Sequence, residues 1–135
     1  MTIVYTDMVG DLFHFGHVEF LEQAHKFGTR LLVGVMSDKQ AEKYKRRPIL
    51  TMEERIRSVQ NCRYVDEVIP DPPLVITDEF LIEHRIDVVC HGDDYSSEEM
   101  REFYSVPIAM GIFQSIPYTA GISTTEIISR IRSRS

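Results

Sequence analysis

RLLVGVMS, residues Arg30–Ser37, is an almost uninterrupted apolar run with polar residues at its ends. Such a run is expected of a central strand in a parallel sheet, because helices cover both faces of that sheet. A shorter β-branched run, TIVYT at Thr2–Thr6, precedes it. Between the two runs, residues 17–28 carry apolar side chains at helical spacing and end at Gly28, a natural helix stop. The order strand, helix, strand predicts a parallel β-α-β unit.

The same alternation continues to the end of the chain. A polar, basic segment ends at Pro48, a helix breaker. Beyond it, the pattern predicts helices over residues 51–62, 77–85, 96–106 and 123–133, and strands over residues 65–70, 87–92 and 112–119. Thr51 followed by Glu54 has the spacing of a capping box, and Thr77 is a typical N-cap residue. This alternation predicts an α/β fold: a Rossmann-like, doubly wound, mainly parallel five-stranded sheet with helices on both faces.

The overall charge and the cysteines exclude several classes of protein. Fifteen basic and twenty-one acidic residues give a net charge of −6, so no general attraction to nucleic acid or anionic lipid is expected. Cys62 and Cys90 show neither CxxC spacing nor a disulfide framework, which fits a reducing compartment. The N-terminus lacks a signal-peptide pattern, and no run approaches the roughly 18 apolar residues of a membrane span. We therefore expect a cytoplasmic protein without membrane insertion, formed as one domain over residues 1–135.

The polar strand-to-helix turns are the candidate functional segments, because ligands of parallel sheets bind beyond the carboxyl ends of the strands. Three such turns stand out: DMVGDLFHFGH at residues 7–17, CHGDDYSS at 90–97 and YTAGISTT at 118–125. In the first, His14 and His17 flank the start of a helix, where backbone N–H groups and the helix dipole favour an anion. Two histidines alone are an incomplete ligand set for a metal ion. Simple capping or packing by the two rings is an open alternative.

HFGH after the first strand, together with GISTTEIISRI at residues 121–131, resembles the cytidylyltransferases of the HxGH nucleotidyltransferase superfamily. RYVDEVI at Arg63–Ile69, EFLIEHRIDVV at Glu79–Val89 and HGDD at His91–Asp94 are similar to the same branch, so the resemblance covers nearly the whole chain. The enzymes that make CDP-choline, CDP-ethanolamine or CDP-glycerol are the nearest in motif. The resemblance implies one nucleotide-binding catalytic domain that transfers CMP from CTP to a small phosphorylated alcohol and releases pyrophosphate.

The resemblance also implies roles for single residues. His14 and His17 would stabilise the pentacoordinate phosphate and the leaving pyrophosphate, and Lys45 would contact the phosphates of both substrates; these three are the implied catalytic residues. Because the attacking phosphate oxygen is already anionic, positioning and charge stabilisation should carry catalysis. The implied nucleotide and triphosphate contacts are Val9, Gly10, Gly16, His91, Asp93, Thr119, Gly121, Ile122, Ser123 and Thr124. Helix capping by Ser123 and Thr124, and a merely solvated basic loop around Lys45, are the alternatives.

The implied contacts of the second substrate are Asp11, Lys45, Tyr104 and Tyr118. Mg²⁺ or another divalent cation is expected with CTP, bound through the triphosphate. The sequence has no direct metal motif, and Asp11 is the one carboxylate considered as a protein ligand. Ordinary turn chemistry is the alternative for Asp11 and Asp93, and it is the preferred interpretation of Asp94.

The chain departs from the family pattern at three places. Tyr118 stands where relatives carry an arginine before GISTT, and tyrosine has no charge at neutral pH. Either Arg46, Arg47 or another cation compensates, or activity is weakened or altered. The turn before HFGH usually contains Gly-x-Phe-Asp, but in Met8–Asp11 the glycine comes two positions later. The backbone path of this turn, and its contacts to nucleotide, are therefore expected to differ.

The third departure bears on the substrate. Choline-type relatives carry a tryptophan in the segment that matches PPLVIT, whereas this chain has Leu74 there and no tryptophan at all. Tyr104 matches a tyrosine that choline-specific relatives use, although a core or surface tyrosine is equally open. Aromatic faces hold a quaternary ammonium at about 0.5–2 kcal/mol each, and a full aromatic cage is not expected here. Phosphoethanolamine or phosphocholine is favoured only slightly over glycerol 3-phosphate.

Two other functions stay open at this level. One is an adenylyltransferase of the same fold, and the other is a nucleotide-binding domain with lost or altered turnover, as Tyr118 and the altered turn suggest. The family tends to form dimers, and RYVDEV resembles the segment at that interface, so we expect a homodimer. The chain ends at RIRSRS without the amphipathic extension of the choline enzymes, so no lipid control is expected.

Overall fold

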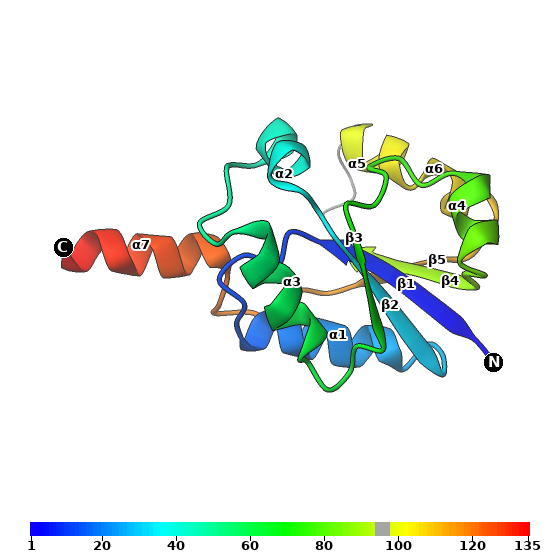
Figure 1. Ribbon diagram of the computed structural model, residues 1–135, viewed down its shortest axis with the longest axis horizontal. Coiled ribbons are helices and arrows are strands. Elements are labelled where there is room, and N and C mark those ends of the chain that lie inside the picture. Colours follow the sequence, from blue (N-terminus) through cyan, green and yellow to red (C-terminus); the bar gives the residue numbers. More distant parts are fainter. Residues whose placement is uncertain (94–97) are drawn as a thin grey trace.

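The computed structural model describes residues 1–93 and 98–135 of the chain. Asp94, expected to be a turn residue, and the predicted helix start at residue 96 lie outside the described residues. The strands are β1 Ile3–Met8, β2 Arg30–Val35, β3 Glu67–Pro70, β4 Val88–Gly92 and β5 Phe113–Ile116. The helices are α1 Phe15–His25, α2 Asp38–Tyr44, α3 Met52–Gln60, α4 Asp78–Glu83, α5 Glu98–Phe103, α6 Ser105–Ala109 and α7 Thr124–Arg134. Figure 1 shows them in chain order, from the blue β1 to the red α7.

The described strands form one parallel sheet in the order β3-β2-β1-β4-β5. The central strand β1 pairs along its whole length with β2, and Val4–Thr6 pairs with Val88–Cys90 of β4. The direction of strand addition reverses between β1 and β4, so the topological switch point lies at their carboxyl ends. The predicted Rossmann-like sheet with helices on both faces is therefore confirmed (Figure 1).

Alternating side chains along the central strands build a core on each face of the sheet. Val4 and Leu31 belong to a buried cluster with α1 and α3. Tyr5 and Leu32, the next residues along each strand, belong to a second cluster with α4 and with partly buried side chains of α5 and α6. The two-sided burial explains why the sequence of β2 is apolar throughout rather than alternating.

Side-chain caps begin several of the helices. The predicted capping box of Thr51 and Glu54 is present at α3, and Thr77 caps α4. The helix α2 was not predicted, although Ser37 and Gln40 form the same kind of box at its start. With seven residues, α2 is too short to show an apolar stripe, so the sequence carried no periodic signal for it.

Two helix boundaries differ from the predicted ones for local reasons. Helix α1 begins at Phe15, one or two residues before the start predicted near Gly16 or His17, because the His14 side chain caps it. The single helix predicted over residues 96–106, ending before Pro107, is wrong in the described part: α5 ends at Phe103, and a separate α6 begins at Ser105 and contains Pro107 in its first turn. Proline is tolerated there because the first N–H groups of a helix have no intrahelical acceptor.

Left-handed backbone shapes the turn that leads from β1 to α1. Gly10 has φ +70° and Leu12 has φ +47°. An ideal Cβ at Gly10 would also lie only 3.1 Å from a methyl carbon of Val59. The glycine whose position departs from the family pattern therefore stands where this backbone requires one.

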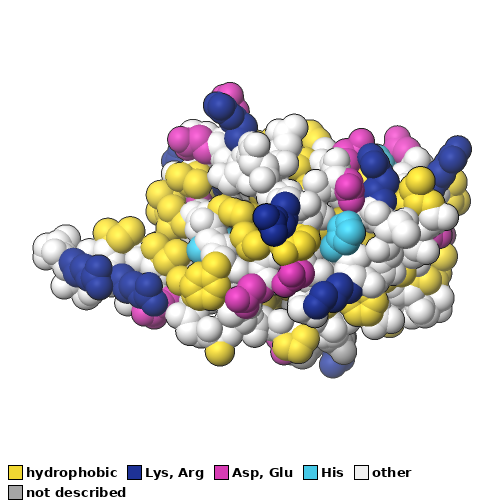
Figure 2. Space-filling model, turned by 90° about the horizontal axis from the view of Figure 1, so that it is seen from below, with side chains coloured by type: hydrophobic (Ala, Val, Ile, Leu, Met, Phe, Trp, Pro, Cys, Tyr) yellow, Lys and Arg dark blue, Asp and Glu magenta, His cyan; other side chains and the backbone are white. Residues whose placement is uncertain are grey.

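Helix α7 projects from the body of the molecule at the C-terminal end (Figure 1). None of its residues is buried, and Ile131 is 60% exposed. Figure 2 shows Lys and Arg side chains gathered along this projecting arm. Neither α7 nor any other helix in residues 1–93 and 98–135 is long and apolar enough to cross a membrane. Only the first turn of α7 contributes to the site described below.

Candidate active site

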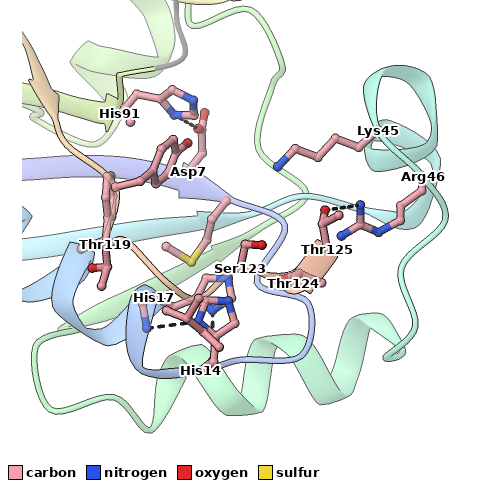
Figure 3. A pocket seen from close by; sticks show the side chains of 16 residues that line it. Asp7, His14, His17, Lys45, Arg46, His91, Thr119, Ser123, Thr124 and Thr125 are labelled. Carbon is pink, nitrogen blue, oxygen red and sulfur yellow. Dashed lines mark hydrogen bonds and ion pairs between the residues drawn. The ribbon is translucent and has the colours of Figure 1, made fainter. Parts of the chain in front are cut away.

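A cavity of about 360 Å³, here called the main cavity, lies at the carboxyl ends of β1 and β4. Helices α1 and α7 begin at its wall, and the loop after α2 faces them across it (Figure 3). Ten of the predicted site residues line it: His14, Gly16, His17, Lys45, His91, Tyr118, Thr119, Ile122, Ser123 and Thr124. The fold thus brings HFGH and GISTT, which are far apart in the sequence, to one site at the topological switch point.

His14 and His17 form the capping box of α1. His14 Nδ1 accepts a hydrogen bond from the Gly16 N–H at 3.0 Å, and His17 Nδ1 accepts one from the His14 N–H at 3.1 Å. An imidazole nitrogen that accepts a hydrogen bond carries no proton, so the proton of each neutral ring is on Nε2. Each ring therefore keeps one N–H donor for a ligand in the main cavity. Capping and ligand binding use different nitrogens and do not compete.

The environment keeps this pair of imidazoles neutral. The pKa of His17 is lowered to about 3, mainly by burial and additionally by the nearby His14 and Lys45, with Asp11 acting in the opposite direction. Burial also lowers the pKa of His14. Protonation of either Nδ1 would in addition replace an acceptor by a donor and break a capping bond. At neutral pH the pair thus acts as two neutral hydrogen-bond donors, not as two cations.

The loop between α2 and α3 carries Lys45 and Arg46 to the main cavity, across from the histidines (Figure 3). Asp11 anchors this loop: its Oδ2 accepts a hydrogen bond from the Ile49 N–H at 2.8 Å, and its Oδ1 accepts one from the Leu50 N–H at 2.9 Å. Asp11 itself is only 4% exposed. Its carboxylate holds the backbone of the loop in place, which fixes where the lysine can reach.

A fully buried arginine ties the same loop to the strand ends. Arg55 Nη1 donates to the carbonyl groups of Val9 and Met36, both at 2.7 Å, and Nη2 donates to Asp38 Oδ1 at 2.6 Å. Its Nε donates to the Leu50 carbonyl at 3.3 Å. One guanidinium therefore joins the ends of β1 and β2 to the start of α2 and the loop after it. The sequence offered no signal for this role, because an arginine in a short polar helix is ordinarily solvated.

The start of α7 supplies hydroxyl groups to the cavity wall. Ser123 caps the helix, with its Oγ accepting a hydrogen bond from the Glu126 N–H at 3.0 Å. Thr124 Oγ1 donates to the Asp11 carbonyl at 2.9 Å, which fastens α7 to the turn after β1. The capping alternative for Ser123 is thus real, yet it does not exclude anion binding, because the first N–H groups of a helix need outside acceptors.

An acidic group that the sequence analysis did not single out lies in the floor of the main cavity. Asp7, near the end of β1, is 3% exposed, and its Oδ1 accepts a hydrogen bond from the Tyr104 hydroxyl at 2.6 Å. The Tyr104 oxygen also lies 2.8 Å from His91 Nδ1. Because the one hydroxyl proton is directed to Asp7, His91 Nδ1 carries a proton and donates to the tyrosine. The other carboxylate oxygen, Asp7 Oδ2, is buried and accepts no hydrogen bond from the described residues.

Tyr118 lines the main cavity beyond the end of β5 and is 51% exposed. Its ring lies against Gly92, where an added Cβ would collide with it, so a glycine makes room for the ring. The ring of Phe20 stacks on it, with the centroids 6.2 Å apart. Thr119, the next residue, donates from Oγ1 to Glu19 Oε2 at 2.8 Å. Tyr118 thus brings an aromatic surface to the site and no permanent charge.

Three predicted residues line a smaller adjoining cavity of about 90 Å³ instead: Val9, Gly10 and Asp11. His17 and Lys45 are common to both cavities. The roles that the resemblance implies for Val9 and Gly10 toward nucleotide stay predictions. Asp11 anchors the loop through its hydrogen bonds to Ile49 and Leu50, and its expected contact with a second substrate stays a prediction.

Tyr104, Asp93 and Gly121 line neither cavity. Tyr104 is 1% exposed, with its ring in the core and its hydroxyl donating to Asp7, and its expected contact with substrate stays a prediction. Asp93 is exposed at the end of the described part of its turn. Gly121, with φ +86°, turns the chain into α7. The implied contacts of Asp93 and Gly121 stay predictions.

Several wall residues of the main cavity were not assigned to the site from the sequence: Asp7, Met8, Phe20, Arg46, Gly92 and Thr125. A usable signal existed for Asp7, because a charged residue near the carboxyl end of a central buried strand is costly unless it has a task. Phe20 reads as an ordinary core residue of a helix, so only the packing of α1 reveals its place. Arg46 was considered from sequence solely as one of two adjacent arginines.

The described residues contain no group of three or more His, Cys, Asp and Glu side chains that could hold a metal ion. Both Asp11 oxygens are occupied by backbone N–H groups, and Asp7 is a single carboxylate. Mg²⁺ usually keeps several waters and binds through few carboxylates together with substrate phosphates.

A family model described as cytidylyltransferase-like matches residues 10–130. This chain belongs to the cytidylyltransferase-like family. The match includes both HFGH and GISTT, and the resemblance seen in these motifs is confirmed at the level of the family. Most residues that line the main cavity of this cytidylyltransferase-like chain lie within the matched part of the sequence. Asp7 and Met8 precede it.

Curated relatives of this cytidylyltransferase-like chain are considerably longer than it is. Choline-phosphate cytidylyltransferase of Saccharomyces cerevisiae is 44% identical over 131 residues, which cover 95% of this chain and 31% of the relative. Ethanolamine-phosphate cytidylyltransferase of Dictyostelium discoideum is 40% identical over 134 residues, which cover 96% of this chain and 37% of the relative. The chain thus spans about a third of the length of these two relatives.

Solved structures share the architecture of this cytidylyltransferase-like chain. The lipopolysaccharide core biosynthesis protein from Thermoplasma volcanium superposes with a TM-score of 0.73 at 26% identity, covering 88% of this chain and 98% of that protein. Pantothenate synthetase from Thermus thermophilus superposes with a TM-score of 0.58 at 12% identity, covering 87% of this chain and 56% of that protein. The second likeness concerns the fold alone.

Proposed function

We propose that this domain transfers CMP from CTP to a small phosphorylated amino alcohol, phosphoethanolamine or phosphocholine, and releases pyrophosphate. The observation that carries the proposal is a separation of charge across the main cavity. Imidazole N–H donors and the start of α7 lie in the wall on one side, Lys45 lies in the wall across from the histidines, and the buried carboxylate of Asp7 lies in the floor. A phosphorylated amino alcohol has the matching polarity, with a phosphate at one end and an ammonium group at the other.

In the proposed reaction, a phosphate oxygen of the amino alcohol phosphate attacks the α-phosphorus of CTP. A new P–O bond forms, the bond to the β-phosphate oxygen breaks, and the electron pair leaves with pyrophosphate. The attacking oxygen is already anionic, so the chain needs to orient it and to stabilise charge on the phosphates. Nε2–H groups of His14 and His17 and the Lys45 ammonium would provide that stabilisation without prior reorganisation.

Mg²⁺ bound with CTP would neutralise part of the triphosphate charge, and the absence of a ligand cluster among the described residues is compatible with a metal carried by the nucleotide. The chain's own contribution is then the placing of donors. Asp11 and Arg55 hold the loop that carries Lys45, and the capping bonds of α1 hold the two imidazoles.

Two relatives named for choline phosphate and ethanolamine phosphate, at 44% and 40% identity, support the amino alcohol over glycerol. The charge of Asp7 supports the same choice, because a carboxylate stabilises an ammonium group and offers glycerol only a hydrogen-bond acceptor. Leu74, at the position of the expected tryptophan, lines neither cavity, and Tyr118 is the aromatic residue with half of its surface exposed there. The described wall therefore favours recognition by charge over recognition by an aromatic cage.

The proposal is tested by a substrate panel. The protein is incubated with CTP, Mg²⁺ and either phosphoethanolamine, phosphocholine or glycerol 3-phosphate, and pyrophosphate release is measured. Release with one or both amino alcohol phosphates is expected. No release with any of the three would overturn the proposal, and consumption of ATP in place of CTP would indicate an adenylyltransferase of the same fold.

One observation favours a second candidate, a nucleotide-binding domain without turnover. Tyr118 lines the main cavity at the position where the family pattern has an arginine, so one expected phosphate contact lacks a charge. CTP binding in a calorimeter without any product would favour this candidate. Activity that appears on Tyr118→Arg would then locate the missing function at this residue. The predicted homodimer is a separate expectation that sedimentation equilibrium would check.

A further inference from the structure

The permanent positive charge of the main cavity comes from one loop. Among the described wall residues, only Lys45 and Arg46 are permanently cationic, and both follow directly on α2. Tyr118 contributes no charge, and burial holds the His17 ring neutral. A nucleoside triphosphate brings several negative charges into this space. Arg46 therefore supplies one of the two permanent positive charges in the described wall, and the family motifs assign it no role.

The guanidinium of Arg46 is held at the start of α7. Its Nη1 donates to Thr125 Oγ1 at 3.2 Å, and Thr125 follows the hydroxyl residues Ser123 and Thr124 in the cavity wall (Figure 3). Guanidinium has five N–H donors in a planar fork that matches phosphate oxygens. The contact with Thr125 leaves the rest of this fork beside the first turn of α7, where backbone N–H groups also favour an anion.

The adjacent arginine offers a contrast on the same loop. Arg47 has a side chain that is 80% exposed, and its Nε lies 4.0 Å from Glu42 Oε1. It lines neither the main cavity nor the adjoining one. The two arginines thus have the same charge and neighbouring positions, but only Arg46 reaches the site.

We propose that Arg46 is a phosphate-binding residue of this site, which grips the triphosphate together with Lys45 and supplies the positive charge that Tyr118 lacks. This inference rests on the proposed function, since it assigns a partner to the nucleotide phosphates. Charge-assisted bidentate contacts between guanidinium and phosphate are among the strongest hydrogen bonds in proteins. Pyrophosphate, the leaving group, presents the same oxygens and is expected to use the same contact.

The test compares Arg46→Gln with the matched control Arg47→Gln. The KM for CTP is expected to rise at least about tenfold in Arg46→Gln and to stay within about twofold of the wild type in Arg47→Gln. Inhibition by inorganic pyrophosphate is expected to weaken in Arg46→Gln by a similar factor. Equal KM values for the two variants would overturn the inference while leaving the proposed function intact.

Two further variants distinguish phosphate binding by Arg46 from a purely structural role, in which Arg46 only links the loop to α7. If Arg46 binds phosphate by charge, Arg46→Lys recovers part of the affinity, and raising the salt concentration narrows the gap between Arg46→Gln and the wild type. If Arg46 only braces the loop, Thr125→Val reproduces the whole loss and salt has no effect, which would overturn the inference. Thermal melts of all variants check that folding is preserved, as expected for an exposed side chain.

The two proposals fail in distinguishable ways. Should the wild type show no turnover, the calorimetric affinities of CTP and of inorganic pyrophosphate for Arg46→Gln and Arg47→Gln test the same contact without catalysis. A wild type that binds neither would overturn both the proposed function and the role of Arg46. Ligand affinities that are equal in the two variants would overturn the role of Arg46 alone.

Discussion

The two imidazoles at the start of α1 show how a backbone contact can prepare a side chain for chemistry. Their Nδ1 atoms accept backbone hydrogen bonds, which leaves the Nε2–H groups for the cavity. Neutral donors of fixed orientation need no reorganisation when charge develops on phosphate. The requirement is for a side chain with both an acceptor and a donor at this spacing, and imidazole provides the two on opposite sides of one ring.

His17→Gln separates capping from ligand binding. Glutamine at this position can still accept the hydrogen bond that closes a capping box, so the free energy of unfolding should change by less than about 1 kcal/mol at pH 7.5. The rigidly held imidazole Nε2–H is replaced by an amide NH₂ on a flexible chain, so kcat/KM is expected to fall by about tenfold or more, toward the 10²–10³-fold of a fully lost oxyanion donor. Urea denaturation and steady-state kinetics measure the two quantities. Near-normal turnover would contradict the assigned role.

The wild type and His17→Gln also test a pH dependence of stability. The pKa of His17 is about 3 in the folded state, below its ordinary value of 6.5, so the unfolded chain binds the proton first as the pH falls. The stabilisation by neutral His17 is therefore complete above about pH 6.5 and is lost progressively toward pH 3, by at most about 1.4 kcal/mol per pH unit. Urea midpoints measured between pH 7.5 and 5 should fall more steeply for the wild type than for His17→Gln. Parallel curves would argue against a buried neutral ring.

The element that decides the geometry of the site is the loop between α2 and α3. It carries both permanently cationic side chains among the described residues that line the main cavity, and its conformation depends on two buried groups from other elements, Asp11 and Arg55. The loop is short and exposed, so its own sequence does not hold it in one conformation. Hydrogen bonds to Asp11, in the turn after β1, and from Arg55, in α3, hold the loop in one conformation.

Asp11→Asn tests the anchoring role against the metal-ligand role. The amide keeps one acceptor oxygen and turns an NH₂ group toward a backbone N–H, so the loop should loosen, with a loss of about 1–3 kcal/mol in the free energy of unfolding. Activity is expected to fall about tenfold through displacement of Lys45, since misplacement by an ångström carries costs of this size or larger. Titration with excess Mg²⁺ checks the cause. Recovery of activity at high Mg²⁺ would favour a metal ligand, and no recovery is expected for an anchor.

Across the whole molecule, the sheet separates the two kinds of charge in the main cavity. Carboxyl ends of β1 and β4 bring Asp7 and His91 to the floor, whereas helix starts and the α2–α3 loop bring the donors and cations to the walls. The net charge of −6 gives the surface no general affinity for anions, so the proposed binding of phosphates would depend on this local arrangement.

Asp7→Asn is the variant that tests this separation of charge. Asparagine keeps an oxygen to accept the hydrogen bond of Tyr104 and removes the negative charge. The value of kcat/KM for phosphoethanolamine and phosphocholine is expected to fall about tenfold or more, because hydrogen bonds to charged groups are the stronger ones. Glycerol 3-phosphate serves as the internal control and should be affected little. An equal loss with all three substrates would mean that Asp7 acts on structure or on the nucleotide.

The alternation of apolar runs and helical patterns was enough to predict the parallel sheet, and the motifs around His14 and Ser123 were enough to identify two distant turns that line one cavity. The apolar runs and the helix-start motifs are both local signals, because a few consecutive residues are enough to indicate a buried strand or the start of a helix. Helix α2 was missed because it is short and has no apolar stripe, although its capping box at Ser37 and Gln40 was readable.

By itself, the sequence determined the alternation of strands and helices and the identity of the two turns expected to bind phosphate, whereas the sheet order that locates the switch point came from the tertiary structure. Only the tertiary structure decided that Tyr104 supports Asp7 from the core, that Asp11 holds a loop, and that Arg46, not Arg47, reaches the cavity. The physical reason is that hydrogen bonds between residues some forty to a hundred positions apart, such as those of Asp11 and Tyr104, depend on how strands and helices pack. No local pattern records which partner a buried polar group will meet.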